Sequence, residues 1–333
     1  MRRTTGQQRV PGLDAGRFLA AVGIVWLHTA GIGPATAPAG AIGRFAVPYF
    51  TLIAVALVVD GVARESPPDF ARFARGRFAR IYLPFLSWTA VYLLLRLAKH
   101  ALRPSSPPPP VGPHLLFVGS AHHLWYLPFV LAVTVAARGA SPLLVRHRRV
   151  GAVAAVVVGA GVALVPTSLT HHPYDPGFRN QINYSLMLGW SAAPSAFWGA
   201  ATGLYLAAIA SKLDDRPWVA TGAALLTAAL LVPGDGAPYA VLRASLAGVL
   251  FFVAVASLPA WRATMTLAGL GRHSFGIYAS HVAYILALEA VMVRDRADFS
   301  GVQAIAIFSV AVAASLATTT ILGRCRATSW AVT

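Results

Sequence analysis

Apolar residues dominate the chain in ten windows, each about long enough to cross a lipid bilayer. A membrane-spanning helix needs roughly 17–25 mostly apolar residues, and Pro, Gly and charged residues separate these windows. The windows are 12–30, 45–63, 78–98, 121–138, 149–166, 186–209, 217–233, 239–258, 272–293 and 301–322. The pattern predicts an all-α fold, a polytopic membrane helix bundle of about ten transmembrane helices, with residues 1–333 as one integral membrane domain.

Composition supports a membrane protein over a basic soluble one. Hydrophobic residues make up 57% of the chain and charged residues 11%, whereas a soluble domain carries about 25% charged residues. The formal net charge is +16, which in a soluble protein would suggest nucleic acid. Here the charges flank the apolar windows, so we expect the lipid bilayer as partner and no nucleic acid. The single cysteine, Cys325, excludes an internal disulfide and any multi-cysteine metal site.

The N-terminus has two possible interpretations. Arg2, Arg3 and Arg9 precede an apolar run, and Ala35-Thr36-Ala37 resembles a signal-peptide cleavage site. Pro38 follows that site directly, and further apolar windows follow Pro38. We therefore expect an uncleaved first transmembrane helix.

The distribution of Lys and Arg predicts the orientation of the helices. If the N-terminus is cytoplasmic, 18 of the 27 Lys and Arg residues fall on the cytoplasmic side and 6 on the outer side. The remaining three, Arg17, Arg96 and Arg243, lie within windows. Positive charges accumulate in cytoplasmic loops, so we expect a multi-pass protein of the plasma membrane with both termini in the cytoplasm.

The first window carries an arginine and a histidine in the stretch "RFLAAVGIVWLH" (17–28). Eleven residues advance a helix by about 16 Å and return to nearly the same face. Arg17 would then lie near the cytoplasmic end, beside Asp14 one turn earlier, and His28 in the outer half. Asp14 and Arg17 could simply anchor the helix at the interface, and His28 could be an inert, hydrogen-bonded packing residue. An intramembrane ionisable group nevertheless suggests function.

Five stretches, in order along the chain, carry a resemblance to the membrane acyltransferase 3 family. They are "LDAGRFLAAVGIVWLH" (13–28), "VPYFTLIAVALV" (47–58), "RGRFARIYLPFLSW" (75–88), "HLWYLPFVL" (123–131) and "LGRHSFGIYASH" (270–281). They resemble, respectively, the arginine–histidine first helix, the second helix, the RxxR stretch, the fourth-helix signature and the "S-x-x-I-Y-x-x-H" pattern. Ala54 and Val55 stand where many members have Ser-Gly, so the tight helix contact of that pair is not expected.

The resemblance implies a membrane-embedded O-acyltransferase. Such enzymes transfer a short acyl group, typically acetyl, from acyl-CoA to a hydroxyl group. The acceptors include cell-surface polysaccharides and other glycans, lipid-linked sugars and secreted natural products. The bias toward Ala, Val, Arg and Pro is typical of a GC-rich bacterial genome. The expected partners are therefore acetyl-CoA or another acyl-CoA and a hydroxylated glycan or metabolite, with no metal.

Acyl transfer to an alcohol needs a base for the hydroxyl proton and a grip on the donor. His28 is the candidate base, and the resemblance makes Arg17 and His28 the catalytic pair. Arg17, Arg77 and Arg80 would meet at the cytoplasmic end, where guanidinium groups can bind the phosphates of coenzyme A. These arginines could instead be interfacial anchors. Direct transfer and an acyl-histidine intermediate both fit, and direct transfer is preferred.

A second intramembrane histidine, His281, shares a helix face with Ser274 and Tyr278 at i, i+4 and i+7 spacing. His281 could act in the site or only pack. Arg243 and Glu289 could pair structurally or line an entrance for the acceptor. The two adjacent histidines at 122–123 lie at the outer entrance to the fourth window without a carboxylate or thiolate beside them, so no metal site is expected there.

Two other functions remain possible. A transporter or flippase could move a glycan or metabolite without acyl-transfer chemistry, since many spans and buried polar groups suit it as well. That class predicts paired halves with broken helices, and the sequence has no such symmetry. A catalytically silent assembly partner would leave His28, Arg17 and Arg80 freely replaceable.

Overall fold

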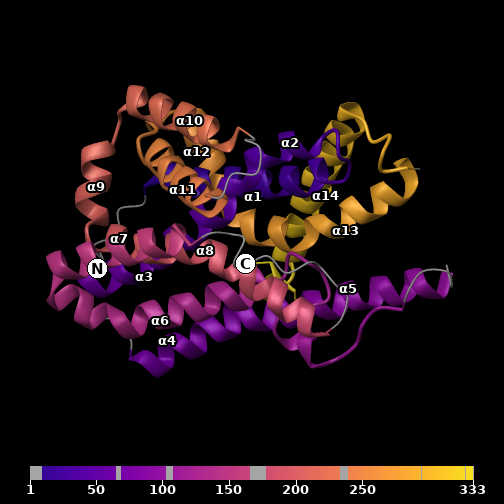
Figure 1. Ribbon diagram of the computed structural model, residues 1–333, viewed down its shortest axis with the longest axis horizontal. Helices are drawn as coiled ribbons and strands as arrows, with labels where there is room; N and C mark the ends of the chain where they lie inside the picture. Colours follow the sequence, from indigo (N-terminus) through magenta and orange to yellow (C-terminus); the bar gives the residue numbers. More distant parts are fainter. Residues whose placement is uncertain are drawn as a thin grey trace.

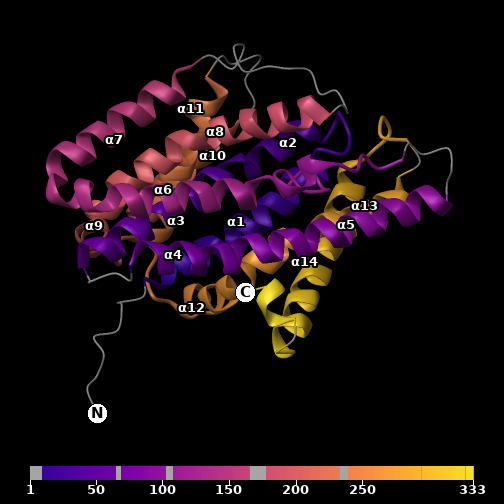
Figure 2. The same ribbon diagram turned by 90° about the horizontal axis from the view of Figure 1, so that it is seen from below.

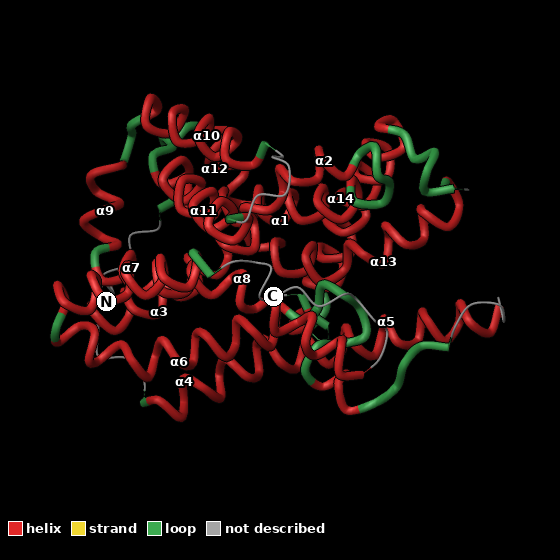
Figure 3. Tube along the Cα trace, in the orientation of Figure 1, coloured by secondary structure: helices red, strands yellow, loops and turns green. Residues whose placement is uncertain are grey.

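The computed structural model describes residues 10–64, 69–102, 108–165, 178–232, 239–293, 295–326 and 328–332, with the backbone alone for 178–185. Every regular element among these residues is a helix. The all-α prediction is therefore confirmed, and the tube in Figure 3 shows long helices joined by short loops.

The elements follow one another along the chain as in Figure 1. The α-helices are α1 (Pro11–Ala30), α2 (Ala37–Gly40), α3 (Ala46–Arg64), α4 (Phe70–Arg77), α5 (Leu83–Leu102), α6 (Tyr126–Arg146), α7 (Arg148–Ala163), α8 (Phe178–Leu204), α9 (Leu206–Leu213), α10 (Pro217–Leu231), α11 (Ala240–Ala256), α12 (Arg262–Leu270), α13 (Ser274–Met292) and α14 (Gly301–Arg324). Short 3₁₀ segments are η1 (Ala41–Phe45), η3 (Pro113–Leu116), η5 (Gly271–His273) and η6 (Ser329–Ala331), and η2 (Phe78–Tyr82) is a π-helix.

Five helical segments of the described chain are long and apolar enough to cross a membrane. They are Ala37–Arg64, Phe70–Leu102, Tyr126–Arg146, Arg262–Met292 and Gly301–Arg324. Helices α10 and α11 are apolar but shorter. Each of the ten predicted windows contains a helix, so the protein is a membrane helix bundle, whereas the number of ten crossings stays a prediction.

Helix α1 occupies the middle of the bundle. It packs against α11 and α12, and against α13 and α14, and Figures 1 and 2 place it between these two groups. Small residues allow this close packing: a Cβ at Gly12 would lie 1.8 Å from the carbonyl oxygen of Val255, and one at Gly16 would lie 2.4 Å from the hydroxyl oxygen of Tyr49. Close approach at glycine is the usual way in which membrane helices pack.

Helix α3 makes a tight contact with α8, although it lacks the Ser-Gly pair. The glycines come from α8 instead. A Cβ at Gly199 would lie 2.5 Å from the carbonyl oxygen of Leu52, and one at Gly203 would lie 2.5 Å from that of Ala56. The close packing of α3 therefore does not depend on the missing Ser-Gly pair, because the small residues can lie on either partner.

We expect Gly199→Ala to destabilise the protein by about 1–3 kcal/mol, the usual cost of overfilling a packed interface. The new methyl group would collide with the backbone of α3, which cannot rotate away. Thermal unfolding in detergent measures the effect. Gly161→Ala in α7 is the matched control, because nothing lies within 4 Å of its Cβ position. Equal melting temperatures for the two variants would contradict the contact.

One long helical rod carries the arginines of the RxxR stretch. Helix α4 begins at its N-cap Asp69, whose side chain accepts a hydrogen bond from the backbone N–H of Arg72 (2.9 Å). That hydrogen bond, followed by nearby arginine charge, lowers the pKa of the Asp69 carboxyl. The rod continues through the π-helix η2, which contains Arg80, into α5. π-Helical turns inside α-helices are frequent at functional sites.

Two of the predicted windows, 121–138 and 186–209, include irregular points where the backbone leaves the helix. The window 121–138 corresponds to α6, which begins only at Tyr126 because an irregular turn precedes it. The window 186–209 is divided at Tyr205, where α8 has ended and α9 begins at the next residue. Hydropathy detects apolar composition, which continues across both irregular points, so it could not locate them.

Candidate active site

Four histidines from three segments meet at one end of α1. His28 lies in the last turn of α1, and His281 lies in the middle of α13. His122 and His123 lie in the turn that precedes α6. The ring centroids are 4.7 Å apart for His28 and His122, and 5.3 Å apart for His28 and His281. Those of His123 and His281 are 5.0 Å apart. We call these four residues the histidine cluster.

The histidine cluster has an accessible side and a buried side. His28 Nδ1 and His122 Nε2 lie 3.1 Å apart, a hydrogen bond whose donor depends on the tautomers. His28 is part-exposed and His122 is exposed. His123 and His281, in contrast, are 2% and 0% exposed. The hydrogen-bonded pair therefore lies toward the surface of the bundle, while the other two rings form the wall behind it.

His281 is oriented by the backbone of its own helix. Its Nδ1 lies 2.7 Å from the carbonyl oxygen of Tyr278 and 3.1 Å from that of Ile277. Because a carbonyl oxygen only accepts hydrogen bonds, Nδ1 carries the proton and Nε2 is left as an acceptor. This Nε2 is buried and has no hydrogen-bond partner among the described residues. Such an unsatisfied acceptor is unusual in a protein interior.

His123 is fixed by two tyrosines. Its ring lies edge-on to those of Tyr92 (5.3 Å between centroids) and Tyr278 (5.5 Å). The Tyr278 hydroxyl donates a hydrogen bond to the main-chain carbonyl of His123. Tyr92 ties α5 to α13, donating to the carbonyl oxygen of Ala279 (2.9 Å). Helices α5 and α13 therefore hold the buried wall of the histidine cluster in place.

The turn before α6 has a geometry that only a small residue permits. Gly119 has a φ angle of +75°, and a Cβ there would lie 2.8 Å from Cβ of Leu124 and 3.0 Å from the hydroxyl oxygen of Thr89. Ser120 then donates from its hydroxyl to the carbonyl oxygen of Thr89 (2.5 Å). These contacts dock the turn on α5, and the docked turn directs the two adjacent histidines toward α1 and α13.

We expect Gly119→Ala to destabilise the protein by about 1–2 kcal/mol from the left-handed backbone conformation alone. The clash with Leu124 adds to this cost and displaces the turn, so any activity that depends on the histidine cluster should fall as well. Thermal unfolding and an activity assay measure the two effects. Gly222→Ala in α10 is the control, since its Cβ position has open space around it. An unchanged melting temperature would show that the turn is not held as described.

Arg96 is a further polar residue at this turn. One of its terminal nitrogens donates to the carbonyl oxygen of Ser120 (2.9 Å), and its charge acts on His122. The sequence placed Arg96 inside a window without a role. In the structure Arg96 holds the turn that carries His122.

His122 and His123 are the residues that sequence reasoning missed. They were considered only as metal ligands, and among the described residues no group of three or more His, Cys, Asp or Glu is arranged to hold a metal ion. The available signal was the pair itself, placed at the start of an apolar window in "SAHHLWYL". Their neighbours on α1 and α13 are far away in sequence, so only the fold could bring them together.

Of the three residues predicted to share a face of α13, two reach the histidine cluster. His281 belongs to it, and Tyr278 contacts it with ring centroids 6.1 Å apart. Ser274 is buried (2% exposed) but begins α13, about 10 Å from His281 along the helix axis. Ser274 therefore does not touch the histidine cluster.

Arg17 near the start of α1 lies within electrostatic range of Arg77, at the end of α4, and Arg80 lies in the π-helix that follows. Arg17 lies 3.7 Å from the carboxylate of Asp14, as their spacing suggested. Arg17 and Arg80 both act electrostatically on Arg77. The Nε atom of Arg77 is buried and has no hydrogen-bond partner in the described part of the chain. We call these three arginines the arginine group; its α1 member, Arg17, lies about 16 Å from His28 along the helix axis.

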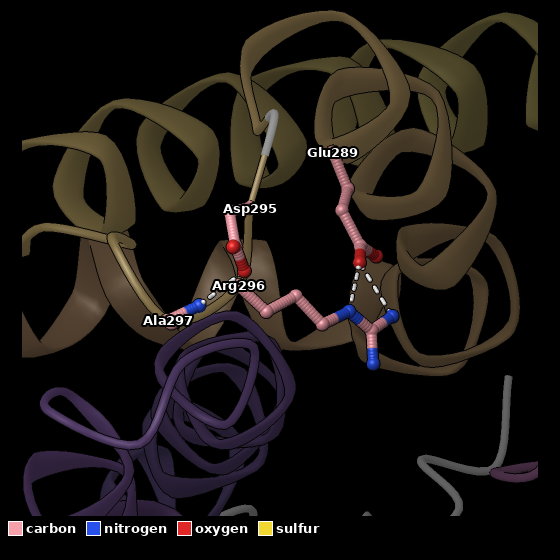
Figure 4. A network of polar contacts seen from close by, with 4 residues as sticks. All are labelled: Glu289, Asp295, Arg296 and Ala297. Atoms are coloured by element: carbon pink, nitrogen blue, oxygen red, sulfur yellow. Dashed lines mark hydrogen bonds and ion pairs between the residues drawn. The ribbon is translucent and has the colours of Figure 1, made fainter.

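Arg243 and Glu289 do not pair with each other. Arg243 donates to the main-chain carbonyl oxygens of Leu230 (3.0 Å) and Val232. Glu289 instead binds Arg296, with its Oε1 atom 2.7 Å from Nε and 2.5 Å from a terminal nitrogen. Figure 4 shows this pair beside the turn at Asp295. The suggested structural pairing of Arg243 with Glu289 is therefore wrong, because each side chain has a partner closer in sequence.

Comparison with known proteins gives one match. A family model described as an acyltransferase domain matches residues 10–324, nearly the whole chain. Neither the curated proteins nor the solved structures provide a match. The matched range includes the histidine cluster and the arginine group.

Proposed function

Because the chain belongs to the acyltransferase domain family, we propose that this membrane protein transfers a short acyl group, acetyl in the simplest case, from acyl-CoA to a hydroxyl group. The acceptor would be a glycan, a lipid-linked sugar or a secreted natural product. The observation that carries the proposal is the accessible His28–His122 pair at one end of α1 with the arginine group at the other.

His28 would act as the general base. If its Nδ1–H donates to His122 Nε2, its own Nε2 is free to accept the proton of the acceptor hydroxyl. The hydroxyl oxygen then attacks the thioester carbonyl carbon, the ester C–O bond forms and the C–S bond breaks. The protonated His28 returns the proton to the departing thiolate, so free coenzyme A leaves as the thiol. His122 would orient His28, as the third member of a catalytic triad orients its base.

The arginine group would bind the phosphates of the donor. Guanidinium groups bind phosphate oxygens in pairs of hydrogen bonds, and the buried Nε of Arg77 has no hydrogen-bond partner among the residues that the structure describes. The separation of about 16 Å along α1 suits a donor whose phosphates and thioester lie at opposite ends of a long flexible arm. In this proposal the arginine group faces the cytoplasmic side of the plasma membrane, where acyl-CoA is made, and both termini lie on that side, in agreement with the distribution of Lys and Arg.

Incubation of the purified protein in lipid nanodiscs with acetyl-labelled acetyl-CoA tests the proposal. We expect release of free coenzyme A thiol and transfer of label to a hydroxylated acceptor. Mass spectrometry of envelope glycans and secreted metabolites, from cells with and without the protein, identifies the acceptor by its added acetyl group. Movement of a glycan across vesicles with no release of thiol would instead favour a transporter and overturn the proposal.

A further inference from the structure

A cationic pocket lies apart from the histidine cluster, between the start of α13 and the end of α14. It has a volume of about 270 Å³. Its lining residues come from η5, from the last turns of α14 and from the C-terminal turn; they are Arg272, His273, Thr319, Thr320, Gly323, Arg324 and Val332. None of them is acidic.

The hydrogen-bond donors of the pocket are nitrogen atoms. Arg272 donates from Nε to Nε2 of His273 (3.1 Å), which leaves the proton of the neutral ring on Nδ1. Among the described residues, neither Arg272 nor Arg324 forms an ion pair with a carboxylate. The hydroxyls of Thr319 and Thr320 both donate to the carbonyl of Leu316. Two guanidinium groups and an imidazole N–H therefore remain to bind an acceptor-rich anion.

The two arginines of the pocket are exposed, but the chain around them is folded back and held in place. The C-terminal turn is tied to α5 by a hydrogen bond from Trp88 Nε1 to the carbonyl oxygen of Ala331 (3.0 Å). A Cβ at Gly276 would lie 2.0 Å from Thr319 and 3.0 Å from Val332, so α13, α14 and the tail are in close contact below the pocket. A Cβ at Gly323 would meet nothing within 4 Å, so this side is open to a ligand.

The pocket lies at the same end of α1 as the arginine group. Gly271, next to Arg272, approaches Asp14 so closely that a Cβ would lie 2.3 Å from its carbonyl oxygen. Asp14 in turn holds Arg17. In the proposed orientation this end faces the cytoplasm, where both coenzyme A and the anionic lipid headgroups of the inner leaflet are found.

We propose that this pocket is a second anion site, in which Arg272 and Arg324 bind a phosphate group. Arg272, His273 and Arg324 line one space with no carboxylate in its lining, and bidentate binding of phosphate is what arginine geometry favours. The phosphate could belong to the nucleotide end of the donor or to an anionic phospholipid. The first source rests on the proposed function, whereas the second does not.

The test uses the full-length protein and measures binding without any acyl transfer. Adenosine 3′,5′-bisphosphate is titrated against protein in phosphatidylcholine nanodiscs, and native mass spectrometry counts phosphatidylglycerol retained from mixed nanodiscs. The double variant Arg272→Gln/Arg324→Gln is compared with Arg326→Gln, which removes a neighbouring exposed charge that does not line the pocket. If the double variant fails to fold, the single variant Arg324→Gln is used in its place.

We expect the pocket variants to bind one of the two probes at least about tenfold more weakly than wild type and Arg326→Gln. Weaker nucleotide binding identifies the donor as the source, and loss of retained phosphatidylglycerol identifies a lipid. Unchanged binding of both probes, or an equal loss in Arg326→Gln, overturns the anion site. Binding is measured separately from acyl transfer. A protein that binds phosphate at this pocket but transfers no acyl group would therefore refute the proposed function and support the anion site.

Discussion

Replacing His28 by alanine is expected to lower the rate of acyl transfer by about 10²–10⁴-fold, the usual contribution of a positioned general base. The imidazole is the only part of residue 28 that can accept the hydroxyl proton, and it lies on the accessible side of the histidine cluster. The KM for acetyl-CoA should change little, since the phosphates would bind about 16 Å away. Release of coenzyme A thiol under saturating donor measures the loss.

The partner histidine provides an internal comparison. His122→Ala leaves the base in place but removes the hydrogen bond at Nδ1, so we expect a smaller fall in kcat than for His28→Ala, again with KM unchanged. His147→Ala is the matched control, because His147 is an exposed histidine between α6 and α7. Activity of His28→Ala within about twofold of wild type would remove His28 from the mechanism, since a twofold change is far below the contribution of a general base.

The sequence predicted the helices better than their ends. The first window, 12–30, matches Pro11–Ala30, and the last, 301–322, matches Gly301–Arg324. A long apolar run has one stable backbone state in lipid, because every buried N–H and C=O group must be satisfied within the helix. The prediction was poorer where the backbone is irregular: Gly119 adopts a positive φ angle inside an apolar context, and the π-helix η2 interrupts a helical rod without any change in hydropathy.

The candidate site was predictable only along single helices. Spacing placed Asp14 beside Arg17 because both lie on one helix, and it placed Tyr278 on the face that carries His281. The contact between His28 and His122 joins residues 94 positions apart, and no periodicity in the sequence encodes it. The same limit explains why Arg243 and Glu289 were considered as a pair. Similar depth in the membrane makes contact between two side chains possible, but it does not determine which residues are in contact.

The arginine group carries more positive charge than the carboxylate described beside it can balance. Three guanidinium groups lie near one another, and the single carboxylate described beside them, Asp14, is 3.7 Å from Arg17. Arg77 contributes a half-buried side chain, stacked over the ring of Phe73 at 5.3 Å, with a buried Nε that has no partner in the described chain. Holding like charges together is unfavourable unless an anion binds between them, which is what a bound donor would supply.

Arg77→Gln is therefore expected to raise the KM for acetyl-CoA with little change in kcat. A hydrogen bond to a charged group contributes about 1.5–3 kcal/mol, which corresponds to a rise of about 10–150-fold. Adenosine 3′,5′-bisphosphate should inhibit the variant correspondingly less well. Arg77→Lys should recover part of the affinity, because it keeps the charge but loses the paired geometry.

The control for Arg77 is Arg72→Gln on the same helix. Arg72 is 80% exposed and lies 3.5 Å from Asp69, so it already has a surface partner and nothing places it near the donor. Exposed pairs of this kind contribute about 0–1 kcal/mol, and the variant should keep the wild-type KM. A rise in KM shared by both variants would mean that the arginines act only through the general positive charge of this end of the bundle. A rise confined to Arg77→Gln would support a specific phosphate contact, because both substitutions remove the same charge from neighbouring turns of one helix.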